Sequence, residues 1–413
     1  MHVCASQAYL ATRPNVALPS FLNPSQRLPV GTFSVPVREF FRALRGKKTY
    51  RMRLPLLLAC LFPVLTATAQ DLKIPLEEVA QTGHYQPIGV GVSHKGRIFM
   101  TFPKKKNDKN YSYDYGLAEI VNGQRRPYPN ALWNQWDSTQ AATRFVNVQA
   151  AVVDADDNLW VLDPSNPDDQ APVIAGIKIL KINLGTNKVE RIYRFEDLPR
   201  ERTGLNDVRI DTRRQLAYIS DPVLAGIVVL DLKSGKSRIV LQGHKSTAAE
   251  PGFVLRLDGK EVKDKSGKPF SSNVNGIALP PDGKYFYYRA INQTKLYRIG
   301  TEYLANPSLS NADLATHVET VGGTGVSHGM LSDEAGNIYL SDSPNYAIRR
   351  VTPAGRLETL VHDPRLSWPD TFALGYDGYL YLTATQINRA PKWNGGESKV
   401  DYPFRLYRIK LPK

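Results

Sequence analysis

The chain has almost no cysteine: its 413 residues include only Cys4 and Cys60. Both lie in an N-terminal segment that we expect to be removed from the mature protein, for reasons given below. The mature protein would then contain no cysteine, which excludes disulfide bonds, thiolate catalysis and cysteine-ligated metals together. Such a protein must be held together by its core and its chain topology alone.

Long apolar runs are also missing. The run Leu54–Leu65 is too short to span a bilayer as a stable anchor. It follows Met52-Arg53 and precedes Ala67-Thr68-Ala69, which gives the basic start, apolar middle and A-x-A end of a secretory signal peptide. We therefore expect residues 1–51 to be a non-native or disordered extension and residues 52–69 a signal peptide. The mature protein would be exported to the periplasm or the extracellular space, without a stable membrane anchor.

Positive charge is scarcer in the mature chain than the total of +14 indicates. Residues 1–69 hold nine basic residues and one acidic residue, so a charge of +6 remains for residues 70–413. This balance does not indicate nucleic-acid binding, and the basic run Lys104–Lys109 is typical of a solvated loop. We expect a monomer that has no nucleic-acid partner.

Motifs of several enzyme classes are absent. There is no H-E-x-x-H, no P-loop, no dinucleotide fingerprint, and no G-x-S-x-G elbow between a predicted strand and a helix. Hydride transfer, ATP use and serine hydrolase chemistry therefore lack support. The composition, 42% hydrophobic and 22% charged, is that of a globular protein with enough length for a large core.

What the sequence does contain is one hairpin pattern, repeated six times. Each copy has alternating apolar residues, a turn of Gly, Asp or Asn, and a second strand with an aliphatic–aromatic pair. The aromatic residues that mark the six copies are Phe99, Trp160, Tyr218, Tyr287, Tyr339 and Tyr381. Each repeat has room for about four short strands. We therefore predict an all-β fold for residues 70–413, a six-bladed β-propeller with four-stranded antiparallel blades around a central channel.

The starts of the six inner strands hold polar residues where apolar ones would be expected. Eleven residues before each aromatic, or twelve in the fourth copy because of Pro280-Pro281, the chain places Ile88, Gln149, Asp207, Asn275, His328 and Asp370. In a propeller these positions converge at one end of the channel. We call these six residues the predicted ring. Asn206 and Asn147 lie close enough in sequence to reach the same opening.

This collection of side chains is compatible with two kinds of site. A polar ligand pocket would use Gln149, Asp207, Asn275, His328 and Asp370, with Asn206 and Asn147 beside them. A site for Ca²⁺ or another divalent cation would use the Asp and amide oxygens, and a neutral His328 would act as a metal ligand or a general base. The alternative is a channel lined by polar residues and water that does no chemistry.

Several stretches are similar to the major royal jelly protein / Yellow family. They run in order over nearly all of residues 72–413 and include GRIFMTFP (96–103), YPNALWNQW (128–136), FVNVQAAVVDADDNLWVLD (145–163) and WPDTFALGYDGYLYL (368–382). The hairpins at Asn275 and Trp368 also resemble the senescence-marker/gluconolactonase-like propellers. The signal peptide and cysteine-free body fit the bacterial members of the family best.

The resemblance implies a secreted six-bladed propeller, in a family that includes dopachrome-converting enzymes, amine binders and storage proteins. The gluconolactonase-like group holds a central divalent cation, and Asn206, Asn275 and Asp370 match its positions. His328 stands where that group has Asp, and the first blade offers Ile88 instead of a glutamate. We therefore carry two hypotheses: a small-molecule binding protein, or an enzyme that is either a cation-dependent lactonase or a tautomerase with His328 as proton shuttle.

Overall fold

The computed structural model describes residues 71–104, 113–167 and 171–412. All described residues belong to one compact unit, Thr66–Lys413. The extension expected for residues 1–51 and the signal peptide expected for residues 52–69 therefore lie outside the described residues. Within the described ranges, we find no helix with the length and apolar character needed to cross a membrane.

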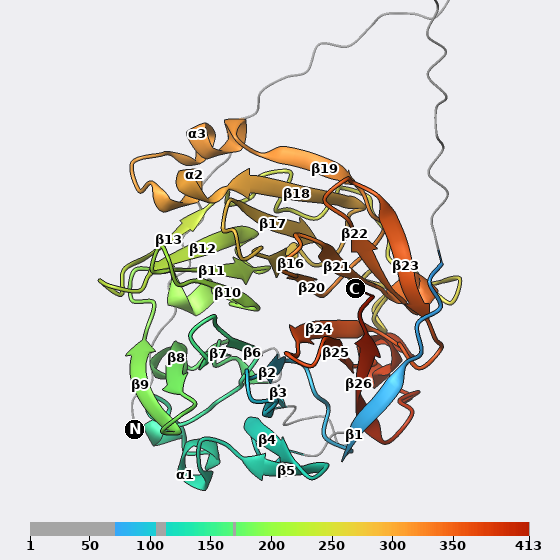
Figure 1. The fold of residues 1–413 in the computed structure, drawn as a ribbon, viewed down its shortest axis with the longest axis horizontal. Coiled ribbons are helices and arrows are strands. Elements are labelled where there is room, and N and C mark those ends of the chain that lie inside the picture. Colours follow the sequence, from blue (N-terminus) through green and yellow to red (C-terminus); the bar gives the residue numbers. More distant parts are fainter. Residues whose placement is uncertain (1–70, 105–112, 168–170, 413) are drawn as a thin grey trace, which may run out of the picture. The chain divides into compact units, whose positions relative to one another are not determined.

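Six four-stranded antiparallel sheets stand around a common axis, which confirms the predicted six-bladed β-propeller (Figure 1). In five blades the strands are consecutive in sequence. Blade 1 holds β2 (Val90–Val92), β3 (Ile98–Thr101), β4 (Leu117–Val121) and β5 (Gln124–Pro127). Blade 2 holds β6 (Ala150–Val153), β7 (Asn158–Asp163), β8 (Lys178–Asn183) and β9 (Lys188–Tyr193). Blade 3 holds β10 (Val208–Asp211), β11 (Leu216–Asp221), β12 (Gly226–Asp231) and β13 (Ser237–Val240).

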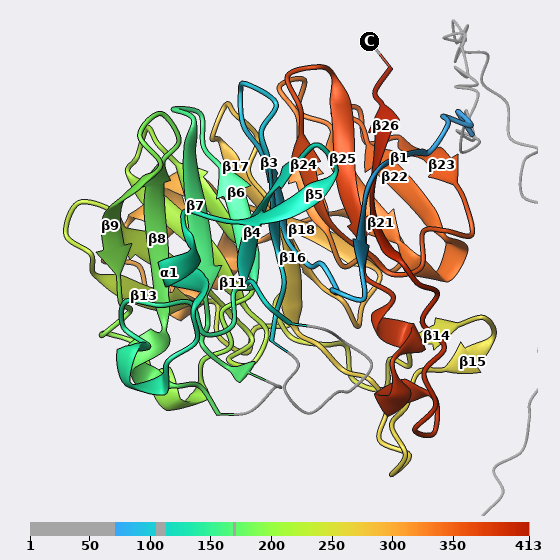
Figure 2. The same ribbon diagram turned by 90° about the horizontal axis from the view of Figure 1, so that it is seen from below.

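Blades 4 and 5 repeat this order. Blade 4 holds β16 (Val274–Ala278), β17 (Tyr285–Ala290), β18 (Lys295–Gly300) and β19 (Glu319–Gly323). Blade 5 holds β20 (Met330–Ser332), β21 (Ile338–Asp342), β22 (Ala347–Val351) and β23 (Leu357–His362). Short helices α1 (Ala131–Asn134), α2 (Thr301–Ala305) and α3 (Asn311–Thr316) lie in the connections, and the hairpin of β14 (Arg256–Leu257) and β15 (Lys260–Glu261) projects from one face of the propeller (Figure 2).

The sixth blade closes the propeller with both ends of the described chain. It contains β24 (Pro369–Leu374), β25 (Tyr379–Ala384), β26 (Phe404–Lys410) and, as its outer strand, β1 (Glu77–Gly83). The run Phe404–Leu411 is typical of a final strand that closes the ring with the first blade. In the structure it forms the third strand of the last blade, and β1 completes the sheet by pairing with it. The sixth sheet is thus completed by strands from both ends of the described chain, with β1 as its outer strand.

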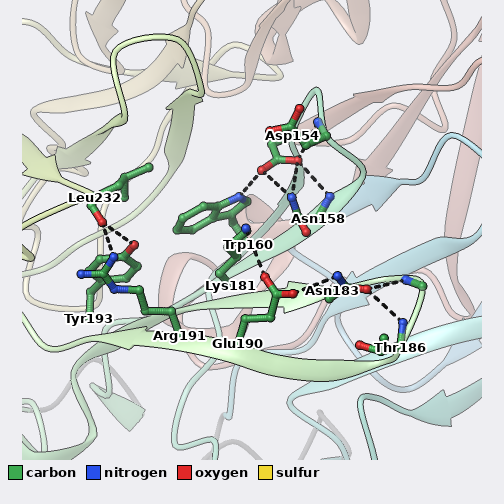
Figure 3. Close-up of polar contacts among 12 residues, drawn as sticks. Asp154, Asn158, Trp160, Lys181, Asn183, Thr186, Glu190, Arg191, Tyr193 and Leu232 are labelled. Carbon is green, nitrogen blue, oxygen red and sulfur yellow. Dashed lines mark hydrogen bonds and ion pairs between the residues drawn. The ribbon is translucent and has the colours of Figure 1, made fainter.

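The repeated aromatic residues have a structural role that explains the hairpin pattern. In three blades the aromatic side chain donates a hydrogen bond to an aspartate in its own hairpin turn, at 2.7–2.8 Å: Trp160 to Asp154, Tyr339 to Asp333 and Tyr381 to Asp377. Figure 3 shows the first of these contacts, next to the Lys181–Glu190 ion pair on the following strands. The aromatic ring itself packs in the apolar layers between blades, so the turn and the core are fixed by one residue.

Hydroxyl groups on the second strands connect neighbouring blades near the axis. Thr101 donates to the Gln149 carbonyl at 2.9 Å, Ser220 to the Asn275 carbonyl at 2.9 Å, and Thr383 to the Ile88 carbonyl at 2.7 Å. In each case the hydroxyl of one blade contacts the start of the inner strand in the next blade. These bonds hold the inner strands of adjacent blades in register.

Replacing Thr383 with valine should destabilise the protein by about 1–3 kcal/mol, because the buried Ile88 carbonyl and the Thr371 amide both lose their partner. Urea denaturation of T383V against the wild type measures the loss. The matched control is T186V, since Thr186 is exposed in a turn. Equal stability of T383V and T186V would contradict the connecting role of this hydroxyl.

Candidate functional site

The strand register changes one member of the predicted ring. Phe99 pairs with Gly91, eight residues earlier, whereas Tyr218 pairs with Arg209, nine residues earlier. The third hairpin therefore carries one extra residue, as the fourth does, and its equivalent position is Asn206. Counting eleven residues back was wrong for Asp207, which lies one place further along the strand. The inner ring of the structure is thus Ile88, Gln149, Asn206, Asn275, His328 and Asp370.

The structure brings the members of the inner ring together around the channel. Each neighbouring pair is linked by a contact near the ring backbone or between ring side chains. Besides the three hydroxyl bonds described above, Gln149 Nε2 donates to Asn206 Oδ1 at 3.2 Å. At the two remaining contacts between neighbouring blades, a glycine lies directly against the backbone of the next blade. A Cβ added at Gly276 would lie 2.6 Å from the His328 carbonyl oxygen, and a Cβ added at Gly329 would lie 1.6 Å from the Asp370 carbonyl oxygen. Glycine is required there because no side chain would fit.

Aspartates at the ends of second strands position the segments that lead into the inner ring. Asp163 accepts hydrogen bonds from the amides of Val146, Asn147 and Ser165 and pairs with the buried Lys178 at 3.1 Å. Asp221 plays the same part in blade 3, where it accepts from the amides of Gly204, Val223 and Leu224. Both aspartates therefore have a structural role in the turns that follow the second strands.

Asn147 is not a member of the inner ring. It is 6% exposed, its Oδ1 accepts from the Lys104 amide at 2.6 Å, and its Nδ2 donates to the Asn166 carbonyl at 3.0 Å. Its side chain links two connecting segments, those of Lys104 and Asn166, and both of its polar atoms already have hydrogen-bond partners. The structure therefore gives the predicted ligand-binding residue Asn147 a structural role.

Asp207 is held by an arginine that the sequence did not single out. Arg209 Nη1 lies 2.9 Å from Asp207 Oδ1, and both side chains are largely buried. The same guanidinium donates through Nη2 to the Met330 carbonyl at 2.6 Å. Because Met330 belongs to blade 5 and Arg209 to blade 3, this side chain reaches past blade 4 near the axis of the channel.

His328 is the most unusual member of the inner ring. It is 1% exposed and stacks on Trp368 with 4.0 Å between ring centroids and 20° between the ring planes. Neither Nδ1 nor Nε2 has a hydrogen-bond partner. Burial, aided by the positive charge of Arg289, lowers the pKa of His328 to about 3, so the imidazole is neutral at physiological pH. It presents one N–H donor and one acceptor nitrogen, both unused.

The other polar members of the inner ring are half-buried, and they belong to blades 2, 3, 4 and 6. They are Gln149, Asn206, Asn275 and Asp370. Two carboxamides already contact each other, and Thr371 donates a long hydrogen bond of 3.5 Å to Asp370. The inner ring therefore combines three amides, one carboxylate and one imidazole, whereas the predicted ring had two amides and two carboxylates, because Asn206 replaces Asp207.

The donor set is a poor match for a tightly held divalent cation. The residues expected to bind it, Asn206, Asn275 and Asp370, supply one carboxylate and two amides. Asp207 is already paired with Arg209. Across residues 71–104, 113–167 and 171–412, no group of three or more His, Cys, Asp or Glu side chains is arranged to hold a metal ion. Ca²⁺ sites of high affinity normally use several carboxylates.

A second concave region lies at the far end of the inner strands. It is a cavity of about 1260 Å³, lined by the ends of inner strands and hairpin turns from all six blades, and no member of the inner ring reaches it. Arg209 is part of its lining. Its charged groups are largely paired with one another or with their own hairpins, as Arg350 is with Glu358 at 2.7 Å. At its rim, the exposed Tyr376 bonds to His94 at 2.6 Å.

Sequence reasoning overlooked a short motif at His328. Gly325-Val326-Ser327-His328-Gly329 has the spacing G-x-S-x-G, but it leads into inner strand β20 and not from a strand into a helix. Ser327 is buried, and its Oγ contacts the Gly329 carbonyl at 3.0 Å and Ser341 Oγ at 3.3 Å. No described base contacts it, so the motif is not a hydrolase elbow.

Comparison with known proteins identifies relatives. The family model described as "Major royal jelly protein" matches residues 146–402. Major royal jelly protein 3 of Apis mellifera is 24% identical over 198 residues, which are 44% of this chain and 33% of the relative. The chain therefore spans about a third of the length of the curated relative that it matches.

The solved structures that the chain resembles include three proteins with other names. They are a streptogramin B lyase (13% identity, 84% of this chain and 100% of that chain, TM-score 0.49), a gluconolactonase of Xanthomonas campestris (10%, 84% and 99%, 0.47) and a calcium-binding protein, regucalcin, of Agrobacterium tumefaciens (13%, 83% and 97%, 0.46). Because the TM-scores are below 0.5, we draw nothing from them about the site or its activity.

Proposed function

This chain belongs to the major royal jelly protein family, and we propose that it is an exported binding protein that holds a small polar or aromatic molecule at the inner ring. The observation that carries the proposal is His328, whose two ring nitrogens are buried without a partner. A buried polar atom that lacks a hydrogen bond costs about 1–3 kcal/mol. A ligand that offers one acceptor and one donor recovers this energy on binding.

We prefer the inner ring to the large cavity because the ring holds a side chain with two buried unpartnered polar atoms, whereas the cavity lining has one such atom, Arg209 Nε. In the large cavity, Asp333 bonds to Tyr339 and Asn337, and Asp154 bonds to Trp160. These groups gain little from a ligand. His328 differs, because among the described residues it is the side chain with two buried unpartnered polar atoms.

Binding without turnover fits His328 better than proton transfer does. An effective general base has a pKa near the pH at which it works, whereas burial and Arg289 lower the pKa of His328 to about 3. This disfavours the tautomerase hypothesis. The lactonase hypothesis needs a cation, and the single ring carboxylate Asp370 is a weak basis for one. We therefore propose neither activity, and we expect a monomeric protein that binds a small molecule and no nucleic acid.

The proposal is tested by a thermal-shift screen of the mature protein against small acids, sugar lactones, aromatic amines and divalent cations. A ligand present at 100 times its Kd adds about 2.7 kcal/mol, which corresponds to a rise in Tm of about 4 °C for a domain of this size. We expect at least one such hit. A screen in which no compound raises the Tm would contradict the proposal.

The hit is then tested on H328F, which keeps the ring stacked on Trp368 and removes both nitrogens. We expect H328F to fold with at least about the stability of the wild type, since it removes two unpartnered polar atoms, and to lose the ligand-induced shift. H328Q is the second variant if phenylalanine does not fit. The control is E334Q, because Glu334 is exposed in the lining of the large cavity. Loss of the shift in E334Q, with H328F unaffected, would place the ligand in that cavity.

A further inference from the structure

A fully buried arginine stands beside the inner ring. Arg289, on β17, is 0% exposed and occupies the strand position that holds a hydroxyl residue in four other blades. Those residues are Thr101, Ser220, Ser341 and Thr383. Like Thr101, Ser220 and Thr383, it reaches toward the next blade, where it donates to Thr324 Oγ1 at 2.7 Å and to the Gly325 carbonyl. These two acceptors precede His328 by only a few residues.

The described hydrogen bonds of Arg289 all go to neutral oxygens. Besides Thr324 and Gly325, they go to the backbone carbonyls of Ala290 and Gln293. No ion pair joins Arg289 to a carboxylate in the part of the chain that the structure describes. Burial lowers the pKa of Arg289 to about 9, so the guanidinium is still charged at physiological pH. A charge buried in this way is costly unless an opposite charge is supplied.

Three carboxylates of blades 3, 5 and 6 have contacts of their own. Asp342 raises the pKa of Arg289 from a distance, but it pairs with Arg349 at 3.1 Å and accepts from Asn345. Asp207 pairs with Arg209. Asp370 has a contact of its own. Arg289 is the charged group that lowers the pKa of His328, because its positive charge disfavours a second positive charge on the imidazole.

We infer that the molecule bound at the inner ring is a small organic anion, with a carboxylate or an equivalent oxyanion directed at His328. This inference rests on the proposed function and narrows its ligand class. A neutral imidazole can donate its N–H to the anionic oxygen and accept from a hydroxyl on the same molecule, as in a hydroxy acid. The field of Arg289 stabilises the anion across a low-dielectric interior. An amine or a divalent cation would meet the same field as repulsion.

The test is a thermal-shift comparison of matched acid and amine pairs with the mature protein: benzoate with benzylamine, lactate with aminopropanol, and gluconate with glucosamine, alongside CaCl₂ and MgCl₂. We expect stabilisation by at least one acid and by none of its amine partners or the two cations. Stabilisation by an amine or a cation, without its acid counterpart, would overturn the inference while leaving the proposed binding function standing. If the broad screen described above also yields no ligand, both the inference and the proposed function fail.

Variants of Arg289 then test whether this residue causes the preference for anionic ligands. For the acid that binds, we expect Kd to rise about tenfold or more in R289Q, the equivalent of about 1.4 kcal/mol, and to change less in R289K, which keeps the charge. E334Q should bind as the wild type does. If R289Q does not fold, the affinity of H328F for the acid is measured instead. This variant keeps Arg289 and removes the two ring nitrogens that would bond to the ligand. An unchanged acid affinity in folded R289Q, or in H328F, would contradict the role assigned to these residues.

Discussion

Replacing Gly329 with alanine should destabilise the propeller by about 3 kcal/mol or more. A Cβ at this position would lie 1.6 Å from the Asp370 carbonyl oxygen and 2.6 Å from its carbon, so the clash is with backbone of the next blade. Backbone cannot rotate away as a flexible side chain does, and the two blades would have to separate at the inner ring. Urea denaturation at neutral pH measures the effect.

Two other glycines allow the loss of stability to be compared with the expected severity of the clash. A Cβ at Gly276 would approach the His328 carbonyl oxygen to 2.6 Å, and a Cβ at Gly323 would meet nothing within 4 Å. We expect G329A to be the most damaging substitution, G276A to be intermediate, and G323A to stay within about 0.5 kcal/mol of the wild type. If G329A proved as stable as G323A, adjacent blades would not meet at the inner ring as described.

Lowering the pH from 7.0 to 4.5 should weaken the wild type by about 2–3 kcal/mol more than it weakens H328F or H328Q. The pKa of His328 falls from an ordinary value of 6.5 to about 3 in the folded protein. Between these two values the unfolded chain binds a proton that the folded chain does not. The contribution of neutral His328 to the free energy of unfolding is therefore fully present above about pH 6.5. It is lost progressively as the pH falls toward 3.

The comparison uses urea denaturation of the three proteins at both pH values. The Asp370 carboxylate and the charge of Arg289 are present in all three proteins, so their contributions cancel in the difference between wild type and variant. An equal loss of stability in wild type, H328F and H328Q would mean that His328 is accessible to protons in the folded state. The description of its nitrogens as buried and unpartnered would then be wrong.

The sequence was sufficient to predict the propeller because its repeat is a local pattern. The hairpin turn, the aromatic residue and its aspartate lie within a few residues of one another, as in Asp333 and Tyr339. The positions that face the channel follow from the same spacing, with one exception. The extra residue near Thr212–Arg214 moves the ring position to Asn206, and no proline pair marked this insertion as Pro280-Pro281 did in the next blade.

The depth of the site could not be predicted in the same way. The burial of His328 depends on Trp368 from the connection into blade 6, and its electrostatic environment depends on Arg289 from blade 4. Arg209 similarly reaches Met330, 121 residues away in sequence. Each of these contacts joins parts of the chain that only the closed ring brings together. In the sequence, Arg209 and Arg289 have the appearance of ordinary strand residues.

The most direct test of the account is a crystal structure of the mature protein with the best ligand of the screen. We predict electron density for the ligand at the inner ring, with an oxygen within hydrogen-bonding distance of a His328 nitrogen. Density in the cavity that Arg350 and Tyr376 line, or on the outer surface, with the two nitrogens of His328 still unpartnered, would contradict it.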